Sequence, residues 1–476
     1  MITLHALGNA EIKTSVTTLT PSQEIVFAAA LYLILERGQR VSRTRLASVL
    51  WPRAAQKVGA HRLRQTILQL KKLGIVVQAD RNNLQLLQHD ACSDVDSLFR
   101  TSASLPSDAP SGEFLPGYAP RCSESFRDWV DTKREQIHNA LTGILVRDLE
   151  RARLKGDWIG VENISSRCLV LDAFNETAVL AQAEATAMRG GKRRAVEILD
   201  RYIEDVGANH EELRLPASLL RRRVVERFPD KAVLQNGDPP FVGRESEMEA
   251  LTAKLEAAKT GRGSAVLLTG EAGIGKSRLS EELARFAALQ GAQLQRAACR
   301  RTDLDRPLSL FVDIVPQLRE MPGALGCSPE TFSSLRRLTD FELRSRDKLW
   351  SADSEMLFGD LRNALFDLFD SVASERWLLI VIEDIQWLDD VSANILGKMI
   401  EWAPTKRILF VLNSRTMDNS VCRVTDAKHL STVSLGPLAP VASSAVFHSI
   451  ASRPEDRKST RLNSSHLPTS RMPSSA

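Results

Sequence analysis

The sequence has no apolar run long enough to cross a membrane. Its longest continuous apolar segment, residues 25–35, has eleven residues, whereas a membrane-spanning helix needs about 20. The chain also does not open with a basic segment followed by an apolar one, which is the pattern of a secretory signal peptide. These two absences predict a cytoplasmic protein without a membrane partner.

Closely spaced cysteines are missing as well. None of the six cysteines forms a Cys-x-x-Cys pair or lies at a Cys/His metal-ligand spacing. This argues against a disulfide framework and against a structural zinc site. We expect reduced, packed cysteines at Cys92, Cys122, Cys168, Cys299, Cys327 and Cys422.

Acidic residues are absent between Val41 and Leu73, where the chain carries eight Lys and Arg. Residues 1–90 hold twelve Lys and Arg and five Asp and Glu, a net charge of +7, although the whole chain has only +4. The basic character therefore belongs to the first part of the chain. A concentrated positive charge of this kind predicts an anionic partner such as the phosphates of DNA.

The first 95 residues follow the order of a winged helix. Residues 1–20 predict a short hairpin that turns at Gly8 and Asn9, and helical periodicity then runs from Pro21 to Gly38. Ser42 is a candidate cap for a second helix that reaches about residue 51, and a third spans about 58–73. Two short strands around Asn82 and Asn83 would form the wing.

The third helix supplies most candidate DNA contacts. Leu63, Ile67 and Leu70 recur at helical spacing and should face inward, which leaves polar side chains outward for base edges or phosphates. A solvated basic face is the alternative. The candidate DNA-binding residues are Arg43, Arg45, Arg62, Arg64, Gln65, Gln69, Lys71 and Lys72.

The segments VSRTRLASVLW and HRLRQTILQLKKLG, followed by the wing, resemble the winged helix of the Streptomyces antibiotic regulatory protein (SARP) family. This resemblance implies binding to double-stranded DNA. After a Ser/Pro-rich stretch at 101–112, the pattern is almost wholly helical from Glu113 to about Arg227. There, GEFLPGY, FRDWV, KGDW and LVLDAFNE resemble the bacterial transcriptional activator domain of the same family.

Two segments of this helical region are similar at a fixed offset. Gly156 and Gly190 occupy equivalent places in them, and their spacing of 34 residues matches the tetratricopeptide (TPR) period. Each segment would be a helix hairpin that stacks on its neighbour. Such a domain is either a protein-contact surface or a spacer, and the sequence leaves both open.

A complete phosphate-binding motif follows a proline-rich boundary at 228–240. An apolar strand ending at Thr269 precedes Gly270, and after four intervening residues Gly275, Lys276 and Ser277 open an amphipathic helix. This strand, loop and helix are the context that a P-loop requires. Gly270, Gly273 and Gly275 would let backbone N–H groups approach phosphates, Lys276 would neutralise the β- and γ-phosphates of ATP, and Ser277 would ligate Mg²⁺.

A second half of such a site follows. The apolar run from Trp377 to Ile382 predicts a buried strand that ends in Glu383 and Asp384. Glu383 would hold Mg²⁺ through water, and Asp384 would orient the attacking water, although the two roles could be exchanged. The alternative is that Glu383 and Asp384 only cap the end of the strand.

The next strand ends at Arg415, whose guanidinium is a candidate sensor of the γ-phosphate or else a surface arginine. FVGRE, GEAGIGKS, IEDIQWLD and NSRT, in this order, resemble the STAND class of signalling ATPases, a branch of the AAA+ superfamily. The resemblance implies that Val242, Gly243 and Arg244 lie near the adenine. It also implies that the nucleotide acts as a switch, with slow hydrolysis, and that the ATP state is a candidate homo-oligomer. Glu383 stands where many relatives carry Asp.

The last segment, 456–476, has no periodic apolar pattern, and Asp456 to His466 resembles a translated sequencing adapter. We exclude it from fold reasoning and expect the ATPase core to be truncated.

The predicted fold class is multidomain: an α+β winged helix (1–95), all-α TPR-like repeats (96–227), a linker (228–240) and an α/β P-loop NTPase core (241–455). The function predicted is an ATP-switched bacterial transcriptional regulator, with RNA polymerase as a candidate partner and the nucleoid as its location when DNA is bound. The alternative is a signalling ATPase whose winged helix contacts protein. An efficient metabolic ATPase is disfavoured because no substrate domain accompanies the P-loop.

Overall fold

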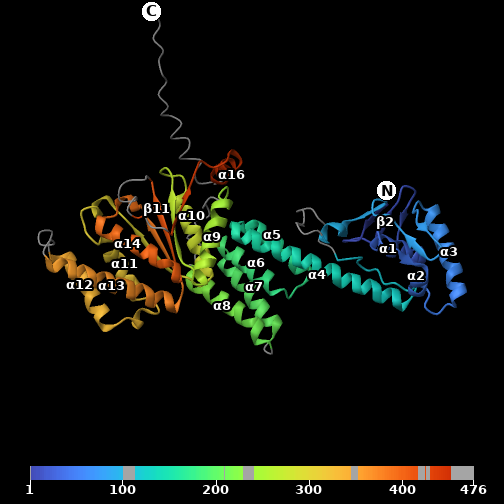
Figure 1. The fold of residues 1–476 in the computed structure, drawn as a ribbon, viewed down its shortest axis with the longest axis horizontal. Helices are drawn as coiled ribbons and strands as arrows, with labels where there is room; N and C mark the ends of the chain where they lie inside the picture. The colour runs from blue at the N-terminus through green and yellow to red at the C-terminus, as the bar shows by residue number, and fades with distance from the viewer. Residues whose placement is uncertain are drawn as a thin grey trace, which may run out of the picture. The chain divides into compact units, whose positions relative to one another are not determined.

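The structure is a computed structural model of the chain, and it describes residues 2–99, 113–207, 210–228, 241–344, 352–415, 424 and 429–451. The chain divides into two compact units (Figure 1). The first comprises Met1–Arg151 and Gly160–Gln182, and the second comprises Ala152–Ile159 and Ala183–Ala476. The predicted loop at 101–112, the tail at 456–476 and all of the predicted linker at 228–240 except Phe228 lie outside the described residues.

The first unit opens with a four-stranded sheet in the order β3-β2-β1-β7. Its strands are β1 (Ile2–His5), β2 (Glu11–Lys13), β3 (Thr18–Leu19) and β7 (Ala91–Ser93). β1 and β2 pair antiparallel, with Thr3 opposite Lys13. Gly8 lies between them at φ 76°, a conformation that favours glycine. The predicted hairpin at the start of the chain is therefore confirmed.

Three helices follow: α1 (Glu24–Leu35), α2 (Arg43–Leu50) and α3 (Gln56–Lys72). α1 is buried on all sides from Phe27 to Ile34, because it is apolar all round. Ser42 occupies the cap position of α2, but its side chain makes no capping hydrogen bond and instead contacts the Thr44 hydroxyl at 2.7 Å. The predicted capping by Ser42 is wrong for this reason.

A small second sheet, in the order β4-β6-β5, lies beside the helices in this unit. Its strands are β4 (Val41–Ser42), β5 (Gln78–Ala79) and β6 (Asn83–Gln85). Between β5 and β6 the Asp80 carboxylate accepts the backbone N–H groups of Asn82 and Asn83 at 2.7 and 2.6 Å. These hydrogen bonds, that of Asn83 first, lower the pKa of Asp80.

The core of the first unit continues beyond residue 95. A short 3₁₀ helix at Asp94–Phe99 follows β7, and the long helix α4 (Glu124–Lys155) adds Phe126, Val130 and Ile137 to the same apolar cluster as α1. Tyr118 also belongs to this cluster, and its ring meets that of Phe27 edge to face at 5.2 Å. The predicted boundary at 95 stays a prediction, although α4 shares the core with the residues before it.

The helical region consists of α5 (Trp158–Leu171), α6 (Glu176–Met188), α7 (Lys192–Val206) and α8 (Glu211–Arg227). Gly156 and Gly190 follow the ends of α4 and α6 with φ values of 68° and 88°, so each terminates its helix in a conformation that suits glycine. The predicted helical character is confirmed here, and the assignment to TPR units stays a prediction.

The second unit contains a five-stranded parallel sheet in the order β12-β8-β11-β10-β9. The strands are β8 (Ser264–Thr269), β9 (Gln293–Ala298), β10 (Leu378–Glu383), β11 (Ile408–Ser414) and β12 (Leu430–Ser434). β10 and β11 are apolar and buried along nearly their whole length, as strands covered on both faces are. Figure 1 shows α9 and α10 on one side of this sheet and α11 and α14 on the other.

The helices of this unit have the following bounds: α9 (Glu245–Lys259), α10 (Lys276–Leu289), α11 (Ser309–Arg319), α12 (Pro329–Arg344), α13 (Ala352–Glu375), α14 (Asp390–Trp402) and α16 (Pro440–Ala451). The chain is thus a multidomain α/β protein whose parallel sheet is compatible with a P-loop NTPase. Among the helices that the structure describes, none is both long and apolar enough to span a bilayer.

Candidate nucleotide site

The glycine-rich loop joins β8 to α10 at the carboxyl edge of the sheet, where ligands of open α/β sheets bind. Gly270, Gly273 and Gly275 have φ values of 151°, 78° and 106°. A Cβ atom at Gly270 would lie 2.8 Å from the Leu435 carbonyl oxygen. The loop therefore keeps its shape only with glycine there, and its backbone lies open to a ligand.

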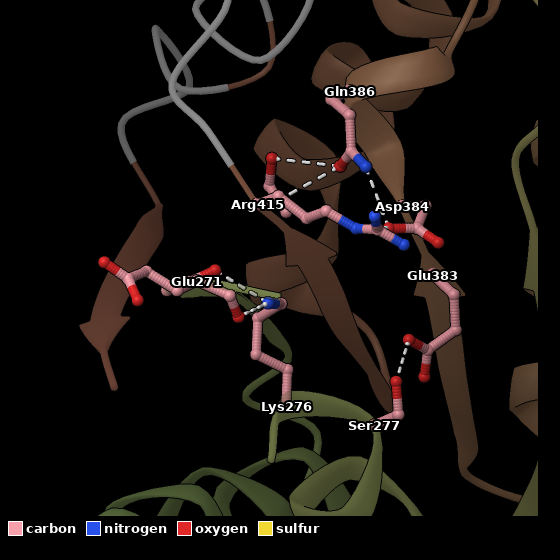
Figure 2. A network of polar contacts seen from close by, with 9 residues as sticks. Glu271, Lys276, Ser277, Glu383, Asp384, Gln386 and Arg415 are labelled. Carbon is pink, nitrogen blue, oxygen red and sulfur yellow. Dashed lines mark hydrogen bonds and ion pairs between the residues drawn. The ribbon is translucent and has the colours of Figure 1, made fainter. Parts of the chain in front are cut away.

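Lys276 is the first residue of α10, and its side chain folds over the loop (Figure 2). Its Nζ donates hydrogen bonds to the carbonyl oxygens of Gly270 and Glu271 at 2.7 and 2.8 Å. The residue is only 8% exposed. Burial, with the nearby Arg415 cation, lowers the pKa of Lys276, while the Asp384 and Glu383 carboxylates act in the opposite direction.

The two adjacent carboxylates at the end of β10 point to different partners. Ser277 donates its hydroxyl to the Glu383 Oε2 atom at 2.8 Å. Asp384 has a left-handed backbone, with φ 55°, and its Oδ1 atom lies 3.1 Å from the Nε of Arg415. The strained turn at Asp384 therefore sends one carboxylate to the P-loop helix and the other to the end of β11.

Gln386 joins this second group, as Figure 2 shows. Its Nε2 donates to Asp384 Oδ1 at 2.8 Å, and its Oε1 accepts the Ser414 hydroxyl and the backbone N–H of Arg415, both at 3.3 Å. The sequence indicated Asp384 and Arg415 and missed Gln386. An amide two residues after a candidate catalytic aspartate was the only local signal.

Arg244 does not extend into open space beside the loop. It is buried and donates to the Ile274 carbonyl at 3.1 Å and to the Gly436 carbonyl at 2.5 Å, and it pairs with Glu247 at 3.0 Å. Arg244 therefore ties the P-loop to the residues after β12. The neighbouring Val242 is half-buried, and a Cβ atom at Gly243 would lie 2.5 Å from Ala442.

The far part of α10 packs on helices that precede the ATPase core in the chain. Glu282 is 2% exposed and accepts the indole N–H of Trp158 at 2.8 Å. This burial raises the pKa of Glu282. Further along, Gln290 donates to Glu184 at 2.9 Å. The helix that begins at the P-loop is thus anchored to the helical region within the second unit.

The residues fit a magnesium-bound nucleotide better than a metal held by protein alone. No group of three or more His, Cys, Asp or Glu side chains that could hold a metal ion occurs in the described part of the chain. Mg²⁺ typically takes one or two protein oxygens and completes its shell with phosphates and water. Ser277 and Glu383 meet that need, and they line a cavity of about 280 Å³.

Residues 240–411 match the AAA ATPase domain family. An AAA ATPase domain implies nucleotide binding, usually with Mg²⁺. The match begins just before FVGRE and ends within β11, so it contains the loop, Lys276, Ser277 and both carboxylates. Arg415 lies just beyond it.

Other proteins are similar to parts of this chain. An uncharacterized protein, R02095 of Rhizobium meliloti (strain 1021), is 24% identical over 195 residues, which are 37% of this chain and 18% of that protein. The chain therefore spans less than a fifth of that relative. The solved structure of Mycobacterium tuberculosis EmbR in complex with a low affinity phosphopeptide aligns with 13% identity and a TM-score of 0.35, over 55% of this chain and 71% of EmbR. A TM-score this low supports no inference.

The candidate DNA contacts lie in the first unit. Leu63 and Leu70 of α3 are buried and Ile67 is half-buried, as predicted. The polar positions of this helix, Arg62, Arg64, Gln65, Gln69, Lys71 and Lys72, are all exposed. In α2, Arg45 is exposed and Arg43 is half-buried. Five described cysteines form no disulfide: Cys92, Cys122, Cys168, Cys299 and Cys327.

Proposed function

We propose that the second unit binds ATP with Mg²⁺ and hydrolyses it slowly, and that this controls a DNA-binding first unit in a transcriptional regulator. The observation that carries the ATPase part is the Ser277–Glu383 hydrogen bond beside the Lys276-covered loop. This hydrogen bond brings the Glu383 carboxylate, a candidate magnesium ligand, to the phosphate-binding loop from a segment more than 100 residues away.

Each residue has a distinct part in this proposal. Gly270, Gly273 and Gly275 present backbone N–H groups to the phosphates, and Lys276 neutralises their charge. Ser277 and Glu383 hold the metal ion, directly or through water. Bound Mg²⁺ would supply charge neutralisation at the phosphate oxygens. Asp384 orients the attacking water, and Arg415 recognises the terminal phosphate.

ATP binding and hydrolysis can be tested separately. We expect Lys276→Ala to abolish ATP binding in titration calorimetry, because it removes the buried cation of the loop. Asp384→Ala should retain ATP binding and lose hydrolysis in a single-turnover assay. Lys398→Ala, at an exposed lysine of α14, is the matched control. Equal loss of binding in both site variants would contradict the separate roles.

We propose that the exposed face of α3 binds double-stranded DNA. Its support is a helix with exposed Arg62, Arg64, Lys71 and Lys72 and no acidic residue, followed in the chain by the β5–β6 hairpin. Phosphate binding needs such a stripe, and Gln65 and Gln69 can reach base edges.

A mobility-shift titration at low ionic strength tests this. Arg62→Ala combined with Arg64→Ala should weaken DNA binding at least about tenfold, since each contact to a phosphate or base contributes on the order of 1 kcal/mol. Arg147→Ala, at an exposed arginine of α4, should have no effect. Absence of salt-dependent DNA binding by the unaltered chain would refute the proposal.

A protein-contact role for α3 is the second candidate. Leu68, on the same helix, is 61% exposed, and a protein partner would cover this apolar side chain. The double arginine variant discriminates, because only the DNA proposal predicts lost DNA binding.

Nucleotide switching, assembly of a homo-oligomer with ATP and contact with RNA polymerase complete the proposed regulator. The STAND resemblance supports the first two, and the order of domains in the SARP resemblance supports the third. Sedimentation velocity with ATP and with ADP tests assembly: a larger species with ATP alone is expected, and identical profiles would contradict switching by oligomerisation.

A further inference from the structure

We propose that Gln386 is a positioning residue for hydrolysis, which fixes Asp384 and Arg415 relative to each other across the ends of β10 and β11. This inference rests on the proposed ATPase function and adds a residue to it. Gln386 belongs to neither strand: it lies in a single 3₁₀ turn, Ile385–Trp387, just after Asp384.

The amide of Gln386 uses both its ends. Nε2 donates to the Asp384 carboxylate, while Oε1 accepts from the Ser414 hydroxyl and from the Arg415 backbone. The residue is 5% exposed, so little water competes for these hydrogen bonds. Among side chains of this length only an amide can donate to a carboxylate and accept from an N–H at the same time.

The turn that carries Gln386 is itself firmly packed. Ile385 and Leu388, on either side, are each 1% exposed. The backbone N–H of Trp387 donates to the Asp384 carbonyl at 3.0 Å. Because its neighbours are buried, Gln386 can hold Asp384 in the left-handed conformation that otherwise costs about 1–3 kcal/mol.

Arg415 is held by Gln386 through its backbone and by Asp384 through its guanidinium. These two attachments are independent. When the guanidinium turns from Asp384 toward a phosphate, the hydrogen bonds of Gln386 still fix the Asp384 carboxylate and the backbone N–H of Arg415. A role in positioning therefore predicts a loss in the rate of hydrolysis that greatly exceeds the loss in ATP affinity.

Two substitutions of nearly equal size test this. Gln386→Glu keeps the acceptor oxygen but places a negative charge against Asp384, and Gln386→Met removes both hydrogen-bonding groups. Gln293→Met is the matched control. Gln293 is also a buried glutamine, but it lies at the amino end of β9, away from the carboxyl edge that carries the site, and its Nε2 donates to the Pro322 carbonyl. Each full-length variant is titrated with ATP and then followed through a single turnover.

We expect both Gln386 variants to hydrolyse ATP about 10- to 100-fold more slowly, since a misplacement of about 1 Å can cost 100-fold in rate. Their ATP dissociation constants should stay within about threefold of the unaltered chain. Gln293→Met should lower the melting temperature without slowing hydrolysis. Unchanged rates in the Gln386 variants, or losses of rate and affinity in equal proportion, would overturn the inference.

The outcome for the unaltered chain separates this inference from the function on which it rests. A chain that binds no ATP would contradict the proposed function itself. A chain that binds ATP but never hydrolyses it would contradict the roles of both Asp384 and Gln386. If the unaltered chain is fully active and Gln386→Met hydrolyses ATP at the same rate, only the positioning role of Gln386 is contradicted.

Discussion

Replacement of Gly270 by alanine should damage the nucleotide site through geometry alone. The φ value of 151° at this position is one that L side chains rarely adopt, and the added Cβ would lie 2.8 Å from the Leu435 carbonyl oxygen and 3.1 Å from the Ile274 side chain. Backbone strain of this kind costs about 1–3 kcal/mol. Without ATP the loop can move to relieve the strain, but it must return to bind phosphates.

The strain should therefore appear mainly as lost affinity. A cost of about 1.4 to 2.8 kcal/mol corresponds to roughly 10- to 100-fold weaker ATP binding. Calorimetric titration with a non-hydrolysable ATP analogue measures this directly. Gly261→Ala is the control: it has a φ of 90° and no atom within 4 Å of the added Cβ, but it follows α9 outside the loop. It should lower the melting temperature and leave affinity unchanged. If Gly270→Ala bound ATP as tightly as Gly261→Ala, the shape of the loop would not be the determinant we infer.

Two further predictions concern charge and protonation. Lys71→Ala combined with Lys72→Ala should reduce the slope of log K against log salt for DNA binding by about 1.8, since each phosphate contact contributes about 0.9; an unchanged slope in filter-binding titrations would remove both lysines from the interface. Burial raises the pKa of Cys299 to about 12, so its thiol should stay protonated and resist iodoacetamide at pH 8 in the folded protein, and react once the chain is unfolded in urea. Rapid modification of native Cys299, read by peptide mass spectrometry, would contradict the buried environment.

The sequence was most informative where the signal is local. β8, the loop and α10 are continuous in the chain, so the strand before Gly270 and the helix after Gly275 could be predicted together. β10 and β11 were predicted from their apolar runs for the same reason. β12 was not predicted, because LSTVS at the edge of a sheet has no continuous apolar pattern.

Contacts between distant residues could not be predicted in this way. Gln386 contacts Ser414 and Arg415 only because β10 and β11 are neighbours and end at the same edge. Arg244 reaches Gly436 across 192 residues of sequence. The position of Arg244 near the adenine, which the resemblance implies, stays a prediction, while its hydrogen bonds join the P-loop to the segment after β12. Asp389 shows the same limit, since it caps α14 and also accepts the Leu308 N–H at 3.1 Å.

The structure also gives a physical reason to assign the two adjacent carboxylates, which the sequence left exchangeable. Two neighbouring negative charges repel each other, and a hydrogen-bond or ion-pair partner for each offsets this cost. The left-handed backbone at Asp384 separates them: Glu383 contacts the Ser277 hydroxyl, a typical magnesium ligand, whereas Asp384 pairs with a guanidinium and an amide. A metal ion at Ser277 would therefore meet Glu383 first, and it would not need Asp384 as a ligand. This arrangement favours Glu383 as the metal-holding residue.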